Sequence, residues 1–444
     1  MTVSPPCGPA MTFCAALLQA VRSQTVPGGV YATGAWGTAL GNLCFGSTEN
    51  QDSVRECGGI AALVALLAPS GSAALRKLAA GALCAVCAGN TQNQDCVRAC
   101  GGIAPLVRLL APGGSAAAQR EAAAALCNLC YRNSQNQDCV RRCGGVAALV
   151  GLLAPGHSAA VHEQAAGALR NLCENNSENK DSIRECGGVA ALVGLLAPGA
   201  SAAVHEQAAG ALTNLCIDST QNAVCVRWCG GIAALVGLLA PGSPATVHEH
   251  AARALCNMCY KNAMNKDCVR ERGGVATLVA LLAPGGSAAV HEQAAKALVN
   301  LASESVQCRE AVRACGGVAA LVALLAPGGP AAVREHAACA LCNLCYKNAM
   351  NKDCMRERGG IAALVALLAP GSSAAMHEHA AGALVHLTNE SGQCREAVRA
   401  CGGVAALERV LACASSAAAH EWVAAALHNL GRDQEDVGDL GQPI

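Results

Sequence analysis

The feature that most constrains this chain is a pair of adjacent glycines that returns every 43 residues. The pairs begin at nine positions, with no insertion or deletion between them: Gly58, Gly101, Gly144, Gly187, Gly230, Gly273, Gly316, Gly359 and Gly402. Self-similarity at a fixed period of about 20–50 residues is typical of repeat proteins. Each unit of such a protein is too small to bury its apolar side alone, so it must stack on its neighbours. The sequence therefore predicts a linear array of one small structural unit.

A short first helix is expected before each glycine pair. In the unit at residues 178–216, Asp181 and Arg184 are three positions apart, so their side chains can pair on one face of a helix. The spacing recurs in most other units, which predicts a structural ladder of ion pairs. Its other members are Asp52/Arg55, Asp95/Arg98, Asp138/Arg141, Asp267/Arg270, Glu310/Arg313, Asp353/Arg356 and Glu396/Arg399.

Two further helices are expected after the glycine pair. Glycine adopts positive φ and permits close backbone approach, so the pair predicts a sharp turn. Apolar residues from Val189 at i, i+3, i+4 and i+7 predict an amphipathic second helix, which Pro198-Gly199 ends. Ser201, replaced by Pro244 or Pro330 in two units, suits the start of a third helix. The buried stripe of this helix is expected at Val204, Ala208, Ala211, Leu212 and Leu215.

This unit resembles the armadillo repeat. The resemblance is carried by Gly-Gly-Ile/Val-x-x-Leu-Val-x-Leu-Leu in the second helix and by Ala-Leu-Arg170-Asn171-Leu-Cys173 at the end of the third. It covers residues 11–430 and implies an all-α fold: an α-solenoid (armadillo-type superhelix) of about ten three-helix repeats with a 43-residue period, the first repeat incomplete. Residues 1–10 are expected to be a flexible N-terminus, and residues 431–444 a polar, disordered tail.

The composition narrows the classes of partner. Lys plus Arg and Asp plus Glu are both 31, so the chain has no net electrostatic attraction to nucleic acid or to anionic membrane. Aromatic residues make up 2% of the chain, which leaves few rings to stack on bases. The apolar runs are too short to span a bilayer, and the N-terminus lacks the pattern of a signal peptide. We therefore expect an intracellular protein, cytoplasmic or also nuclear, that binds no nucleic acid and inserts into no membrane.

The resemblance implies a binding site on the third helices. In armadillo proteins these helices line a concave groove, in which a ladder of asparagines holds an extended peptide. An asparagine amide both donates and accepts hydrogen bonds, so it can bind a peptide backbone without reading its sequence. The ladder positions here are Asn42, Asn128, Asn171, Asn214, Asn257, Asn300, Asn343 and Asn429, and two repeats carry Ala85 and His386 instead. The six from Asn128 to Asn343 are the predicted peptide-binding asparagines.

Other side chains are expected on the same helical face. Seven residues before the asparagine lie Gln164, Gln207, His250, Gln293 and His336, and four residues before it lie Arg253 and Lys296 in two repeats. Importin-α-like receptors carry tryptophan four residues before the asparagine, and its absence here disfavours that class. β-Catenin-like proteins line the groove with Lys and Arg for acidic ligands, whereas Arg253 and Lys296 form only a weak basic spot.

Two further ladders are predicted to be structural. Histidine precedes glutamate near the start of most third helices, as in His162/Glu163, but helices in adjacent layers lie about 8–10 Å apart. Single imidazoles at that separation cannot share one zinc ion. Cys-x-x-Cys pairs such as Cys84/Cys87 are replaced in other repeats by residues that bind no metal, which favours packing. The sequence thus predicts no metal, no cofactor and no catalytic residue.

The predicted function is that of a non-enzymatic protein-interaction scaffold or adaptor. Its groove is expected to bind an extended or helical segment of a protein partner. The alternative is a structural, rod-like component of a larger assembly, cytoskeletal or ciliary. Self-association through the exposed first repeat is a further expectation. Catalysis is disfavoured because the chain lacks the phosphate-binding, nucleophile-elbow and zinc-protease fingerprints.

Overall fold

The computed structural model describes residues 39–413 and 416–438, and this part of the chain contains helices and no strand. The all-α fold class is confirmed. Residues 39–44 are helical and precede the first complete repeat. The expectations for the N-terminal segment 1–10, for most of the first repeat and for its self-association concern residues outside the described range.

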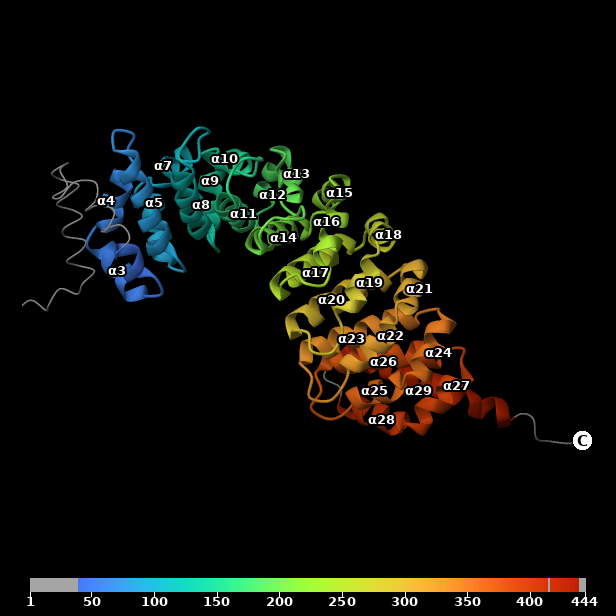
Figure 1. Ribbon diagram of the computed structural model, residues 1–444. Helices are drawn as coiled ribbons and strands as arrows, with labels where there is room; N and C mark the ends of the chain where they lie inside the picture. Colours follow the sequence, from blue (N-terminus) through green and yellow to red (C-terminus); the bar gives the residue numbers. More distant parts are fainter. Residues whose placement is uncertain (1–38, 414–415, 439–444) are drawn as a thin grey trace, which may run out of the picture. The chain divides into compact units, whose positions relative to one another are not determined.

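The helices α3 to α29 follow one another in triplets, as the repeat predicts (Figure 1). The first helices are α3 (Thr48–Glu56), α6 (Thr91–Ala99), α9 (Ser134–Arg142), α12 (Ser177–Glu185), α15 (Thr220–Trp228), α18 (Ala263–Glu271), α21 (Val306–Ala314), α24 (Ala349–Glu357) and α27 (Gly392–Ala400). The second helices are α4 (Gly59–Leu66), α7 (Ile103–Arg108), α10 (Gly145–Gly151), α13 (Gly188–Gly194), α16 (Gly231–Leu238), α19 (Gly274–Ala280), α22 (Gly317–Leu324), α25 (Gly360–Leu367) and α28 (Gly403–Cys413). The third helices are α5 (Ala73–Cys87), α8 (Ala116–Cys130), α11 (Ala159–Leu172), α14 (Ala202–Cys216), α17 (Ala245–Cys259), α20 (Ala288–Ala302), α23 (Ala331–Cys345), α26 (Ala374–Thr388) and α29 (Ala417–Gly438).

The chain divides into two compact units, residues 1–231 and 232–444. In the first unit each third helix packs on the next, from α5 through α8 and α11 to α14. In the second unit the same packing runs from α17 through α20, α23 and α26 to α29. Contacts between neighbouring repeats are what defines a solenoid. Each unit is therefore an α-solenoid, as the sequence predicts.

The two glycines of each pair are needed for different physical reasons. Gly144 has a φ of 76°, the left-handed conformation that L-residues with a side chain rarely adopt. Gly145 opens helix α10, and a Cβ there would lie 2.4 Å from Cγ1 of Val140 and 2.9 Å from its carbonyl oxygen. The first glycine therefore permits the turn, and the second permits the close contact between the first and second helices.

Helix starts, core and ion pairs follow the sequence closely. The hydroxyl of Ser201 accepts a hydrogen bond from the backbone N–H of Val204, and Pro244 and Pro330 precede α17 and α23. The predicted stripe of α14 is buried. Six of the predicted ion pairs lie within 4.0 Å: Asp52/Arg55, Asp95/Arg98, Asp138/Arg141, Asp181/Arg184, Asp267/Arg270 and Asp353/Arg356.

The C-terminal boundary requires a correction. Helix α29 continues to Gly438, so the first eight residues of the tail expected to be disordered, 431–438, are helical. Gly431 does not adopt positive φ, so it does not end the helix as a left-handed glycine would. Residues 439–444 lie outside the described range.

The two glycines that bound α10 provide a test of this fold. Gly145→Ala is expected to lower the free energy of unfolding by about 1–3 kcal/mol, because its new methyl group meets a backbone carbonyl. Gly151→Ala, in the same helix, places its Cβ in open space. It is expected to raise the free energy of unfolding by up to about 1 kcal/mol, because alanine favours a helix over glycine. Chemical denaturation followed by circular dichroism measures both. Equal losses in the two variants would contradict the close-packing role of Gly145.

Candidate functional site

The six predicted ladder asparagines are all half-buried and lie on the third helices, near the C-terminal ends. Their side chains are not free, because the amide nitrogen already binds the preceding repeat. In five of them Nδ2 donates to the carbonyl oxygen 44 residues earlier, over 2.9–3.2 Å. These bonds run from Asn128 to Cys84, Asn171 to Cys127, Asn214 to Arg170, Asn300 to Cys256 and Asn343 to Val299. The ladder is thus first of all a set of bonds between neighbouring repeats.

The side-chain oxygen of the same amides remains available for a further hydrogen bond. Within the described residues, Oδ1 of Asn128, Asn171, Asn214, Asn300 and Asn343 accepts no hydrogen bond and is not buried away from solvent. In Asn128, Asn171 and Asn300 the amide nitrogen also donates to a cysteine sulfur, at Cys84, Cys127 and Cys256. These five asparagines therefore present one acceptor per repeat, in an orientation that the inter-repeat bond fixes.

The predicted neighbours of the asparagines divide into two groups. Gln164, Gln207 and His336 are half-buried. His250 is 8% exposed and Gln293 is 6% exposed, so these two are buried and add little surface to the face, contrary to the expectation. Gln293 lies on α20, which packs tightly against both α17 and α23, and this packing covers its side chain.

The weak basic spot predicted at Arg253 and Lys296 is compensated within its own helices. Nη2 of Arg253 lies 2.5 Å from Oε1 of Glu249, and Nζ of Lys296 lies 2.6 Å from Oε1 of Glu292. The hydrogen bond from Lys296 lowers the pKa of Glu292, so this carboxylate stays charged. These pairs turn each cation toward a carboxylate one turn earlier and leave little net positive charge.

A different cation on the face has no such partner. Arg170 forms no ion pair in the described part of the chain, and its Nη1 donates to Oε1 of Gln207 over 3.4 Å. Its guanidinium lies over Gly210, where a Cβ would come within 3.0–3.1 Å of it. Glycine at this position therefore makes room for an uncompensated positive charge beside Asn171 and Asn214.

A second set of asparagines, on the first helices, is the main polar feature that sequence reasoning missed. These side chains are fully buried, and each donates from Nδ2 to the carbonyl oxygen seven residues earlier, at the end of the preceding third helix, over 2.8–3.0 Å. They are Asn93, Asn136, Asn179, Asn222, Asn265 and Asn351. The signal was present in the sequence, since asparagine recurs at the third position of most first helices, with Cys308 and Cys394 in two repeats.

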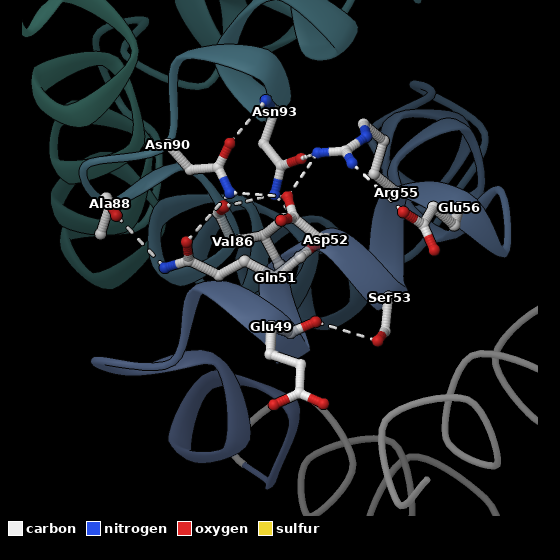
Figure 2. A network of polar contacts seen from close by, with 10 residues as sticks. All are labelled: Glu49, Gln51, Asp52, Ser53, Arg55, Glu56, Val86, Ala88, Asn90 and Asn93. Atoms are coloured by element: carbon white, nitrogen blue, oxygen red, sulfur yellow. Dashed lines mark hydrogen bonds and ion pairs between the residues drawn. The ribbon is translucent and has the colours of Figure 1, made fainter. Parts of the chain in front are cut away.

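Together the two sets of asparagines and neighbouring glutamines cap the third helices. An α-helix leaves its last four carbonyls without partners from its own turns. At the end of α8 each of these accepts from a side-chain amide: Cys127 from Asn171, Asn128 from Gln94, Leu129 from Asn136 and Cys130 from Gln137. Figure 2 shows the corresponding network one repeat earlier. There Gln51 donates to the carbonyl of Ala88, Asn93 donates to that of Val86, and Asn90 donates to Oε1 of Gln51.

The histidine ladder is structural, as the helix spacing predicts. Nε2 lies 3.0–3.3 Å from the carbonyl oxygen eight residues earlier, at the end of the second helix. The bonds join His162 to Ala154, His205 to Ala197, His248 to Ala240, His291 to Ala283 and His377 to Ala369. The imidazoles thus tie each third helix to the loop before it. Among the described residues no group of three or more His, Cys, Asp or Glu side chains could hold a metal ion.

The second cysteine of each Cys-x-x-Cys pair is buried, and the first is buried at Cys256 and half-buried at Cys84, Cys127 and Cys342. Burial raises the pKa of Cys84 and of Cys256 to about 11, and that of Cys127 and of Cys342 to about 12. Burial raises the pKa of their partners further, as it does for Cys130. Metal binding and nucleophilic attack both require a thiolate, and a pKa this high leaves little thiolate near neutral pH. This favours packing as the role of these thiols.

Comparison with known proteins agrees with this geometry. The Armadillo/beta-catenin-like repeat model matches residues 47–88, 90–131, 176–217, 262–303 and 305–346, and the model of the spinocerebellar ataxia type 10 protein domain matches residues 118–193. The chain belongs to the armadillo-repeat family. Armadillo repeats generally mediate protein–protein interaction, and their solenoid is typically not an enzyme.

The similar solved structures are engineered proteins. One is 29% identical over 95% of this chain and 98% of its own length, with a TM-score of 0.84. Another is 32% identical over 55% of this chain and 96% of its own length, with a TM-score of 0.52. The search of curated proteins found no match. No helix in the described residues is long and apolar enough to cross a membrane.

The capping role of the buried asparagines predicts a stability difference within one helix. Asn93→Ala removes the amide that binds the carbonyl of Val86 and should lower the free energy of unfolding by about 1–3 kcal/mol. Gln92→Ala, at the exposed neighbouring position, should stay within about 0.5 kcal/mol of the wild type. Urea denaturation of the two variants side by side measures the difference. A neutral Asn93→Ala would show that the carbonyl needs no side-chain cap.

The raised thiol pKa values predict an order of alkylation. With iodoacetamide at pH 8, Cys84 and Cys127 should react far more slowly than the exposed Cys186. The rate at Cys84 should rise with pH until the pH approaches about 11, because only the thiolate reacts and its fraction grows in that direction. Mass spectrometry of tryptic peptides gives each rate. Rapid labelling of Cys84 at pH 8 would contradict its burial.

Proposed function

We propose that this armadillo-repeat chain is a non-enzymatic scaffold or adaptor that binds an extended or helical segment of a protein partner along the face of its third helices. The observation that carries the proposal is the state of the ladder amides. Asn128, Asn171, Asn214, Asn300 and Asn343 are each fixed by a bond to the preceding repeat and keep an oxygen that accepts no hydrogen bond from the described residues.

This arrangement suits a peptide backbone. A fixed amide loses little freedom on binding, and its oxygen can accept a hydrogen bond from the N–H of one peptide residue. Neighbouring third helices lie about 8–10 Å apart. An extended chain covers this distance in about two to three residues, at about 3.3 Å per residue. One contact per repeat would therefore follow the backbone of the partner at every second or third residue.

Arg170 supplies a preference for charge. It is half-buried, it has no carboxylate partner in the described residues, and it lies between two ladder asparagines. An acidic side chain of the partner would compensate it, whereas Arg253 and Lys296 already have partners in their own helices. The segment that fits this part of the face is therefore extended and carries an acidic residue.

The free state of the cysteines indicates the cellular compartment in which such binding would occur. The described cysteines are all free, in a chain that has 29 cysteines in total. Free thiols in this number are typical of a reducing compartment. An intracellular location, cytoplasmic or nuclear, is therefore part of the proposal, and the proposed partner is a protein rather than a nucleic acid.

The test uses two matched sets of asparagine substitutions. The groove variant carries Asn128→Ala, Asn171→Ala and Asn214→Ala, and the control carries Asn93→Ala, Asn136→Ala and Asn179→Ala. Both sets remove amides that cap third helices, but the control side chains are fully buried. Peptides selected from a phage-displayed random library against the wild type are then measured against both variants by fluorescence anisotropy.

The proposal predicts that peptide affinity falls at least tenfold in the groove variant and stays near wild type in the control, after both are checked for helicity. It also predicts that the selected peptides are enriched in acidic residues and bind Arg170→Glu more weakly. Equal affinity for the two variants would contradict the site. A stable oligomer that selects no groove-dependent peptide would favour the structural, rod-like alternative.

A further inference from the structure

Three pairs of cysteines on the first helices are not explained by peptide binding or by core packing. They are Cys96/Cys100, Cys139/Cys143 and Cys225/Cys229, which lie at the same two positions of α6, α9 and α15 and of the cap residue that follows each helix. Each Cys-x-x-Cys pair of the third helices has at least one buried cysteine, whereas none of these six thiols is buried, and Cys100 is exposed.

Helical geometry brings the two thiols of each pair together. The backbone N–H of the second cysteine donates to the carbonyl of the first, over 2.9 Å for Cys100 to Cys96 and 3.0 Å for Cys143 to Cys139 and for Cys229 to Cys225. Residues with this spacing lie on one face, with Cβ atoms about 5–6 Å apart. The two thiols of each pair therefore share one side of the helix, and after burial the neighbouring thiol is a further cause that raises the pKa of Cys96, Cys139 and Cys229.

Positive charge lies beside two of the pairs. Arg55 of the preceding repeat opposes the raised pKa of Cys96, and Arg142 and Arg98 do the same for Cys139. A guanidinium in this place stabilises negative charge on the sulfurs. Arg55 and Arg98 also form ion pairs with Asp52 and Asp95, whereas Arg142 forms none in the described residues. The pair at Cys139 is therefore the best placed of the three to hold two thiolates at once.

We infer that these three pairs are dithiolate sites for a soft monovalent cation of the Cu⁺ class. Thiolate sulfur selects Cu⁺ among biological metals. Zinc normally takes four ligands, and no third His, Cys, Asp or Glu joins a pair to form a metal-binding group in the described residues. Cu⁺ can be held by two thiolates alone. Binding releases one proton from each thiol to solvent and forms two Cu–S bonds, so the site gains a net charge of minus one and no electron is transferred.

The repeat itself supplies the controls. At the cap position, Cys57, Cys186 and Cys315 have the same place in the fold, but the residue four positions earlier is Ser53, Ser182 or Ala311. These single thiols resemble the paired ones in all but the second sulfur. If binding requires two sulfurs, the paired cysteines should bind the cation and the unpaired ones should not.

The test is a competitive titration of the reduced full-length chain with Cu⁺ under anaerobic conditions, with bicinchoninate as the coloured competitor. The pair variant carries Cys100→Ser, Cys143→Ser and Cys229→Ser. The matched control carries Cys57→Ser, Cys186→Ser and Cys315→Ser, which makes the same chemical change at the same helix position. Circular dichroism checks that both variants retain their helices.

The inference predicts that the pair variant binds three fewer equivalents of Cu⁺ than the wild type, and that the control loses none. Ser182→Cys, which gives Cys186 a partner, should add one equivalent. Equal copper binding by the pair variant and the control would overturn the inference, as would a wild type that takes no Cu⁺ from the competitor. Because this readout needs no peptide, its failure is independent of the failure of the proposed peptide-binding function.

Discussion

The structure depends on how the C-terminal carbonyls of the third helices are satisfied. A helix that ends inside a stack of other helices cannot leave these groups to water, and a buried carbonyl without a partner costs about 1–3 kcal/mol. Here the partners are side-chain amides. At the end of α8, one comes from Gln94 in the same repeat and three come from the next repeat, at Asn136, Gln137 and Asn171. The same bonds that complete one helix therefore join it to its neighbour, which is the nearest-neighbour coupling that a solenoid needs.

This constraint also determines what the exposed face can do. Ladder asparagines such as Asn171 and Asn214 donate from the amide nitrogen to the preceding repeat, so their amides are held in place and present an oxygen to a partner. The inter-repeat bond and the proposed peptide contact are thus two roles of one side chain. The buried asparagines on the first helices have only the first role, because they are fully enclosed. The difference between the two sets is one of exposure and not of chemistry.

The sequence predicted the fold because the fold is set by a short repeat: the glycine pairs, the apolar stripes and the helix caps all recur at 43 residues. It did not predict features that depend on contacts between repeats. The burial of His250 and Gln293 and the capping role of Asn93 arise from packing between neighbouring helices. Left-handed residues between the third and first helices were also missed. Seven repeats carry a non-glycine residue there. Asn175 and Asp218 belong to types that adopt this conformation, but Glu304, with φ 59°, does not, and no local preference predicts it.

Natural variation along the chain permits a direct measurement of the capping account. Helices α17 and α23 end on carbonyls bound by Asn265 and Asn351, whereas Cys308 and Cys394 replace that asparagine after α20 and α26. Arg309 and Arg395 bind the last carbonyl of α20 and α26, at Ala302 and Thr388, so these two helices lack only the asparagine amide at the carbonyl before it. Hydrogen–deuterium exchange of the unmodified protein, resolved by peptide, compares the final turns of these four helices. The account predicts faster exchange at the ends of α20 and α26, because a turn with one cap fewer opens more often. Equal or slower exchange there would show that the amides do not hold the repeats together.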